Sequence, residues 1–337
     1  MTKGVWAAEA VPTRRSVLGV GAALAAGVLV PAARAQDAYP NRPVTIMVGF
    51  PPGTATDTVA RLLAEQFSQT IRGSRFIVEN RGGQGGSIGA AAVARSAPDG
   101  YTITVGASAP QAINPHIYPT LSYDPRKDFQ PIGRIVDLPY ALVVNKDLPY
   151  RSMKDLMDAA KAKPGEVTFA STGNGTTSHL LMSVLAHATG ARLNHVPFRG
   201  TAQSVTDIIA GRINATIDTV AGTIPFIRDG QVRALAVTSQ QRSSLLPDVP
   251  TTAEAGYPDL RGGAWLAMFA PAGIPKPVLD RLSTSLREAL ANEKIRATLQ
   301  NLGMELAPST PDEMSEVLLR DYDRWGEIVR LTGAKAD

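Results

Sequence analysis

Two stretches of the sequence change from the alternation of a β-strand to the spacing of an α-helix across one short, glycine-containing turn. In the first, residues 44–67, apolar residues alternate at the start and then recur every three or four positions from Val59. Thr54 or Thr56 is placed to cap the helix, and Asp57 falls in its first turn. We therefore predict a strand, a tight turn and a helix whose first amides point back at the turn.

The second stretch, residues 167–190, repeats this layout with a turn that is richer in hydroxyl groups. A strand leads into the polar turn 171–178, and Gly190 ends the helix that follows. First-turn amides have no partner within a helix and lie at the positive end of its dipole, so each turn is predicted to attract a carboxylate. His179 either faces a ligand, caps the helix or faces solvent. The alternative for the first turn is an ordinary connection that binds nothing.

Strands alternate with helices along the chain, as is typical of parallel α/β sheets, whose ligands bind beyond the carboxyl ends of the strands. Two long apolar strands, at 139–145 and 265–270, divide the sequence into an outer and an inserted part. We predict a two-lobed α/β protein with a ligand cleft, in which domain 1 comprises 36–139 and 262–337, domain 2 comprises 140–261, and a double crossover joins them. The two turns would then face each other across the cleft.

Residues 1–35 have the features of an export signal. Two arginines, Arg14 and Arg15, precede an apolar run of 14 residues, and Ala33-Arg34-Ala35 resembles a cleavage site. The apolar run is too short to span a bilayer comfortably, and an uncleaved anchor is the alternative. We predict a cleaved twin-arginine-type signal peptide and a mature periplasmic chain that starts near Gln36 and does not span the membrane.

The composition argues against several classes of function. The chain has no cysteine, and its four histidines lack metal-binding spacing, so we expect no metal. The glycine-rich segment 81–89 matches neither the dinucleotide fingerprint nor the P-loop, and we expect no cofactor. The first 35 residues hold four basic residues and one acid, which is most of the net charge of +4. No basic stripe remains, so nucleic acid is not a predicted partner.

Residues 106–110, GASAP, come closest to an enzymatic motif. They follow a strand and are one residue short of the G-x-S-x-G nucleophile elbow, with Ser108 as the nucleophile. However, Pro110 replaces the glycine that allows the sharp turn of an elbow. The sequence after it, Asn114-Pro115-His116, is typical of a loop, whereas a nucleophile elbow is followed by a helix. A secreted serine hydrolase that uses Ser108 is therefore the alternative function, and a polar loop at a strand end is the favoured interpretation.

Arg199 and Asp218 are charged residues at the ends of predicted elements. They would lie beside a cleft between the domains, or else form part of a surface ion pair of little energetic value.

Several blocks of sequence occur in the order found in one known family. They are VTIMVGFPPGTATDTVAR, VENRGGQGGSIGAAAVARSAPDGYT, AINPHIY, STGNGTTSHL, VPFRGTA and RALAVTSQQRSSLLPDVPTTAEAGYPDL, with GAKAD at the end. Over nearly all of residues 37–337 the chain resembles the Bug-type (TctC-like) periplasmic solute-binding proteins of tripartite tricarboxylate transporters. The resemblance implies a type II-like periplasmic-binding-protein fold that closes on a small carboxylate: a di- or tricarboxylate, an acidic amino acid or an aromatic acid.

The resemblance also implies a function in transport and not in catalysis. Loop backbone groups and ordered waters would hold the ligand, and the membrane subunits of a tripartite tricarboxylate transporter would receive it. We expect a monomer without catalytic residues. The residues predicted to bind the ligand are Phe50, Gly53, Thr54, Ala55, Thr56, Asp57, Ser108, Ala109, Gln111, Ser171, Thr172, Gly173, Asn174, Gly175, Thr176, Thr177, Ser178, Arg199, Asp218 and Ala221.

Overall fold

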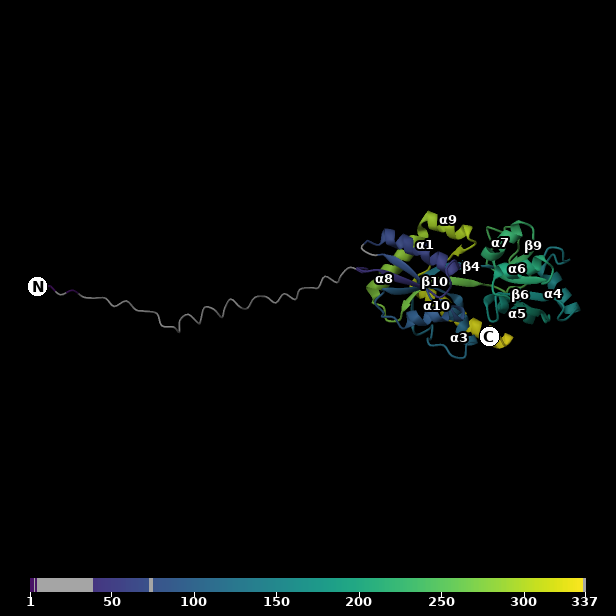
Figure 1. Ribbon diagram of the computed structural model, residues 1–337, viewed down its shortest axis with the longest axis horizontal. Coiled ribbons are helices and arrows are strands. Elements are labelled where there is room, and N and C mark those ends of the chain that lie inside the picture. The colour runs from purple at the N-terminus through teal and green to yellow at the C-terminus, as the bar shows by residue number, and fades with distance from the viewer. Residues whose placement is uncertain (3, 5–38, 73–74, 336–337) are drawn as a thin grey trace. The chain divides into compact units, whose positions relative to one another are not determined.

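Two mixed β-sheets, each flanked by helices, organise the chain in the computed structural model (Figure 1). The structure describes residues 1–2, 4, 39–72 and 75–335, so the predicted signal peptide lies almost entirely outside the described residues. By its contacts, Pro40–Asp337 is one compact unit. Among the described residues, no helix combines the length and apolarity needed to cross a membrane.

The first sheet has the strand order β11-β4-β10-β3-β1-β2. Strands β1, β2 and β3 are parallel, and β10 runs antiparallel to β3 and β4. The strands are β1 Val44–Val48, β2 Phe76–Asn80, β3 Thr102–Ala107, β4 Phe129–Leu138, β10 Ala264–Pro271 and β11 Glu305–Leu306. The α-helices between and after them are α1 Ala55–Thr70, α2 Ser87–Ala94, α3 Asn114–Ile117, α8 Lys276–Ala291, α9 Glu293–Asn301 and α10 Pro311–Thr332.

The second sheet has the order β7-β6-β8-β5-β9 and is built entirely from the middle of the chain. Its strands are β5 Tyr140–Asn145, β6 Thr168–Ser171, β7 Asn194–Pro197, β8 Ala215–Thr219 and β9 Val232–Val237. Its helices are α4 Met153–Ala162, α5 Thr177–Thr189, α6 Thr201–Ile209 and α7 Val220–Arg228, which gather around this sheet in Figure 1. Strand β5 is antiparallel to both of its neighbours, β8 and β9.

Capping residues set the ends of the predicted helices. The Thr54 hydroxyl accepts the Asp57 N–H and starts α1, whose apolar face is fully buried. The prediction that Thr54 or Thr56 caps this helix is thus confirmed at Thr54. Thr310 and Glu313 form a capping box at the start of α10, with Pro311 at its first position.

The structure corrects the prediction of a loop after Pro110. A π-helical turn, Ala109–Ile113, leads directly into α3. Proline is compatible with this position because the first residues of a helix do not need an N–H partner within it. Ala112 and Ile113 are fully buried, which holds the segment against the core.

Two further elements are set by features beyond the local apolar pattern. The apolar spacing continues through residues 277–299, but the helix is divided at Asn292, whose side chain caps α9 by accepting the N–H groups of Lys294 and Ile295. Strand β4 was not predicted, because Pro131 and Gly133 interrupt its pattern. Strand β4 nevertheless stays extended because it lies between β10 and β11 and pairs with both. Its pairing with β10 contains register shifts.

The connections between the sheets join one carboxyl edge to the other. Strand β4 ends at the edge where β1 and β3 end, and β5 starts at the edge where β6 and β8 end. Pro139 alone links β4 to β5, and residues 238–263 link β9 to β10. The two connections are bonded together, since Tyr140 N–H donates to Thr238 Oγ1 at 3.0 Å and Thr238 N–H donates to the Tyr140 carbonyl at 2.9 Å. The two carboxyl edges therefore adjoin.

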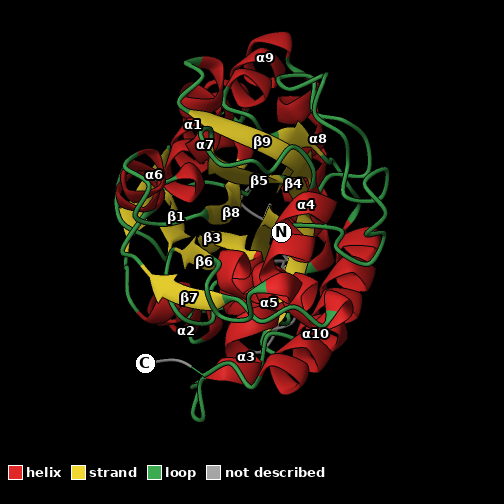
Figure 2. Cartoon of the chain, turned by 90° about the vertical axis from the view of Figure 1, so that its right-hand side faces the viewer, coloured by secondary structure: helices red, strands yellow, loops and turns green. Residues whose placement is uncertain are grey.

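The C-terminal helix forms a second link between the sheets. Helix α10 packs against β4 of the first sheet. It also lies alongside α5 of the second sheet, as Figure 2 shows. The predicted domain boundaries at residues 139/140 and 261/262 coincide with the connections, and they stay a prediction.

Gly263 is the tightest point of the crossover. A Cβ atom there would lie 2.2 Å from the Leu138 carbonyl oxygen and 2.9 Å from Tyr140 Cδ2. We expect Gly263→Ala to lower the free energy of unfolding by about 1–3 kcal/mol, because two backbone segments must move apart. At Gly200 a Cβ would meet nothing within 4 Å, so Gly200→Ala should change stability by less than about 0.5 kcal/mol. Urea unfolding of both variants measures the difference, and equal values would contradict this view of the crossover.

Candidate ligand-binding site

The predicted ligand residues lie at the two adjoining carboxyl edges. In the first sheet, β1 and β3 pair in parallel, so the segments 50–57 and 108–111 emerge side by side. In the second sheet, β6, β7 and β8 are parallel, so the turn 171–178, Arg199 and the segment 218–221 share an edge. The structure thus brings the predicted residues of each sheet to one edge, and places both edges next to the crossover.

Direct packing also joins the two edges. A Cβ atom at Gly175 would lie 2.6 Å from Ile117 Cδ1 of α3, so the turn 171–178 contacts the helical segment that follows Ser108. Similarly, a Cβ at Gly303 would lie 3.1 Å from the Ala221 nitrogen, at the start of α7. Groups that are distant in sequence therefore border the same region.

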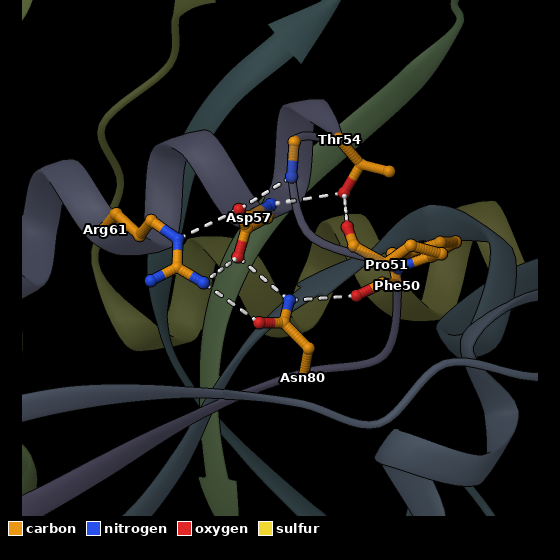
Figure 3. A network of polar contacts seen from close by, with 7 residues as sticks. Phe50, Pro51, Thr54, Asp57, Arg61 and Asn80 are labelled. Atoms are coloured by element: carbon orange, nitrogen blue, oxygen red, sulfur yellow. Dashed lines mark hydrogen bonds and ion pairs between the residues drawn. The ribbon is translucent and has the colours of Figure 1, made fainter.

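The Asp57 carboxylate organises the first turn (Figure 3). It accepts hydrogen bonds from Gly53 N–H at 2.9 Å, from Arg61 Nε at 3.0 Å and from Asn80 Nδ2 at 2.9 Å. Asn80 also donates to the Phe50 carbonyl at 3.0 Å. Burial raises the pKa of Asp57, but the three hydrogen-bond donors outweigh burial and hold the pKa below its usual value.

These bonds decide which donors of the first turn face outward. The Gly53 N–H is taken by Asp57, and the Asp57 N–H is taken by the Thr54 hydroxyl, which itself donates to the Pro51 carbonyl at 2.9 Å. The amides of Ala55 and Thr56 are the other donors at the start of α1, and a helix supplies no internal partner for them. Asp57 thus orients the turn, and we expect a ligand carboxylate to meet the two remaining amides.

The segment after β3 brings two polar side chains into the interior. Ser108 and Gln111 are fully buried, and among the described residues neither Ser108 Oγ nor the Gln111 amide has a hydrogen-bond partner. Buried polar atoms in proteins are nearly always paired, so both side chains are suited to a water or a polar ligand. Among the described residues, no histidine or acidic side chain is hydrogen-bonded to Ser108 Oγ. A nucleophilic serine needs such a base within hydrogen-bonding distance.

The second turn is held by its own side chains. Ser178 Oγ accepts the Thr172 N–H at 3.0 Å, and Ser171 Oγ accepts the Gly173 N–H at 3.1 Å. Gly175 N–H donates to His179 Nδ1 at 3.0 Å, so His179 caps the turn. Most of the amides within the turn are therefore used internally, whereas the sequence suggested that they were bare.

The start of α5 is the part of this edge best suited to an anion. Its N-cap residue, Thr176, makes no side-chain capping bond, so the amides of Thr177 and Ser178 lie at an uncapped helix N-terminus. The Thr177 side chain lies near the Tyr140 hydroxyl, which belongs to a buried residue at the crossover. Burial and the nearby Asp218 charge raise the pKa of the Tyr140 hydroxyl, which keeps it a donor.

Asp218 lies within β8 and is almost fully buried. It accepts hydrogen bonds from Thr201 Oγ1 and from Thr219 N–H, both at 2.7 Å, and burial raises the pKa of its carboxyl group. Sequence reasoning missed Tyr140 and Thr201, because their proximity to Asp218 depends on strand pairing and helix packing. Arg199 lies exposed in the loop before α6.

In the part of the chain that the structure describes, no group of three or more histidine or acidic side chains could hold a metal ion. A cavity of about 650 Å³ adjoins the crossover and is lined by charged residues including Arg134, Asp137 and Arg324, but not by the predicted ligand residues. The candidate site is thus defined by the converging loops.

Two lobes built around separate sheets, joined by a double crossover with adjoining carboxyl edges, define the class of bilobal binding proteins. The family model of the tripartite tricarboxylate transporter family receptor matches residues 59–334. BugT of Bordetella pertussis is 37% identical over 95% of this chain and 97% of its own.

Solved structures with similar sequences have the same fold. R. palustris Rpa4515, determined with adipate, is 33% identical with a TM-score of 0.78 over 89% of this chain and all of its own. MatC of Rhodopseudomonas palustris, with bound malate, is 31% identical with a TM-score of 0.74 over 86% of this chain and all of its own. The chain belongs to the tripartite tricarboxylate transporter receptor family, with its two-lobed periplasmic-binding-protein fold.

Asp57→Asn tests the organising role of this carboxylate. The Asp57 side chain is only 4% exposed, and an amide in its place would direct N–H groups at other donors, so we expect a loss of about 2 kcal/mol or more in unfolding free energy at pH 7. Because the pKa of Asp57 is lowered, this stability is present above about pH 4 and disappears as the pH falls through the folded-state pKa.

Asp155→Asn is the matched control, since Asp155 occupies a similar capping position at the exposed start of α4. Its effect should be clearly smaller. Denaturant unfolding at neutral and acidic pH measures both variants. A loss for Asp57→Asn no larger than for Asp155→Asn would show that the network does not organise the turn.

Proposed function

We propose that the protein captures a small carboxylate between the adjoining edges of its two sheets and delivers it to the membrane subunits of a tripartite tricarboxylate transporter. The observation that carries the proposal is the uncapped N-terminus of α5, which lies beside hydroxyl groups at the crossover. Two family members support a dicarboxylate as the ligand, since Rpa4515 was solved with adipate and MatC with bound malate.

The available interactions are strong enough for such a ligand without a bound metal. Each helix dipole contributes about 0.3–2 kcal/mol, and each hydrogen bond to a charged oxygen contributes about 1.5–3 kcal/mol. Donors from α1 and α5 together supply a gross interaction energy of the size that micromolar binding needs, roughly 8 kcal/mol, and preformed turns keep the ordering cost low. Hydroxyl and amide donors hold a carboxylate without a fixed counter-charge, so release requires only that the lobes separate.

The rest of the proposal concerns the setting of the protein. It is exported through the twin-arginine route, acts as a monomer in the periplasm, and has the domain boundaries given above. It is not an enzyme: a hydrolase that uses Ser108 gains no support from the family, and the Ser108 hydroxyl is fully buried. A p-nitrophenyl ester assay decides this point, because hydrolysis that disappears in Ser108→Ala would favour the hydrolase.

Thermal shift with malate and adipate tests carboxylate binding. A ligand at 100 times its Kd should stabilise the protein by about 2.7 kcal/mol, which raises its Tm. Thr177→Pro removes one backbone N–H at the first position of α5, where proline fits the helix and the extended backbone of Thr176. We expect it to weaken binding about tenfold or more.

Thr177→Val is the matched control, because it removes the hydroxyl but keeps the backbone N–H. It should weaken binding less than Thr177→Pro does. Equal binding by the wild type and Thr177→Pro would exclude the α5 amide as a ligand donor, and the absence of any shift with either acid would count against a dicarboxylate ligand.

A further inference from the structure

Two histidine side chains stack face to face behind the turn 171–178. His179, in the first turn of α5, and His195, in β7, have ring centroids 4.1 Å apart and planes inclined by only 7°. Phe169 of β6 stacks on His195 at 4.7 Å. Phe169 also lies 6.3 Å from His179, so three nearly parallel rings pack together and hold both imidazoles in place.

Each imidazole is bonded to a different part of the turn. His179 Nδ1 accepts the Gly175 N–H at 3.0 Å, and His195 Nε2 lies 2.6 Å from the Ser171 hydroxyl oxygen. That oxygen in turn accepts the Gly173 N–H at 3.1 Å. The turn is therefore held at both ends of the segment 171–175 by one stacked pair.

This arrangement requires an unprotonated Nδ1 on His179. An imidazolium nitrogen has no lone pair and cannot accept the Gly175 N–H. Two positive charges 4.1 Å apart would also repel each other, so at most one ring takes a proton readily. Burial lowers the pKa of His179, and the adjacent helix N-terminus also disfavours its cationic form.

Two further titratable side chains line the cavity beside the pair. The cavity of about 340 Å³ beside it is lined by His187 of α5 and by Arg192 from the segment before β7. The elements β6 and α10 also border this cavity, through Phe169 and Thr332, and neither of these side chains is titratable. Within the described residues that line this cavity there is no carboxylate that would stabilise a histidinium.

We propose that His179 and His195 are positioning residues for the turn 171–178, and that protonation of His179 at Nδ1 releases Gly175 and weakens ligand binding in acid. The claim about ligand affinity rests on the proposed function, whereas the claim about the turn does not. Loss of the Gly175 bond would loosen the segment directly before the α5 N-terminus, at the point where Gly175 packs against Ile117.

The amide signal of Gly175 reports on the turn without any ligand. In the wild type, labelled at glycine, we expect its proton shift to move with a midpoint below about pH 6.5, the ordinary value for histidine. His179→Asn places a side-chain oxygen near the position of Nδ1, so it keeps an acceptor that does not titrate. Its Gly175 signal should stay near the neutral wild-type position at every pH, whereas in His179→Phe it should resemble the acidic form at every pH.

His187→Gln is the matched control, since His187 lines the same cavity from the last turn of α5, away from the turn 171–178. Its Gly175 titration should equal that of the wild type. A wild-type Gly175 signal that does not titrate, or one that titrates equally in His179→Asn, would overturn the proposal.

Affinities for malate and adipate at about pH 7.5 and pH 5.5 test the consequence for binding. The ratio of wild-type Kd to His179→Asn Kd cancels the protonation of the acids themselves. We expect this ratio to rise about tenfold on acidification. A constant ratio would overturn the link to binding. If neither acid bound at either pH, the proposed function would fail, and the Gly175 titration would still decide whether the pair positions the turn.

Discussion

The single-residue connection at Pro139 is the constraint on which the site depends. It joins the end of β4 to the start of β5, and the strand directions make these two points belong to the carboxyl edges of their sheets. The second connection is bonded to the first through Tyr140 and Thr238, so neither can lengthen independently. Turns that lie more than 100 residues apart in sequence are thereby held beside one another.

In both turns, most of the hydrogen-bonding groups bond to other groups of the same turn or to its immediate neighbours. In the first, the buried Asp57 carboxylate gathers Gly53, Arg61 and Asn80. In the second, serine hydroxyls and the two stacked histidines have this role. What remains for a ligand is a small number of helix-start amides in fixed positions. Such preorganisation lowers the ordering cost of binding, which otherwise consumes much of the available interaction energy.

The contrast between the two turns bears on how a carboxylate is accommodated. The charge of Asp57 is compensated by Arg61 at 2.9 Å, so the first edge presents little negative potential to an arriving anion. The second turn has no acidic side chain, and Asp218 is enclosed by Thr201 and Thr219. The uncapped start of α5 therefore lies in the more favourable surroundings for an anion.

Local sequence patterns were enough to predict the strand–turn–helix units, because apolar alternation, helical spacing and caps such as Thr54 act within a few residues. Strand β4 escaped prediction, since Pro131 and Gly133 argue locally against a strand that the sheet imposes from both sides. The partners that shape the site also escaped. Asn80 lies 23 residues from Asp57, and Ser171 lies 24 residues from His195, so their contacts exist only after the strands pair. The two strand–turn–helix units were thus correctly located along the chain, whereas the segment after Pro110 and the internal bonding of the turns could be learned only from the structure.

The most direct test is a crystal structure of the protein with malate or adipate bound, from material purified without refolding. The ligand should lie beside the crossover, with one carboxylate within hydrogen-bonding distance of amides at the start of α5 and further contacts from the segments after β1 or β3. A ligand held by one sheet alone, or held mainly by arginine or lysine side chains elsewhere on the surface, would contradict convergence of the two edges on a single anion.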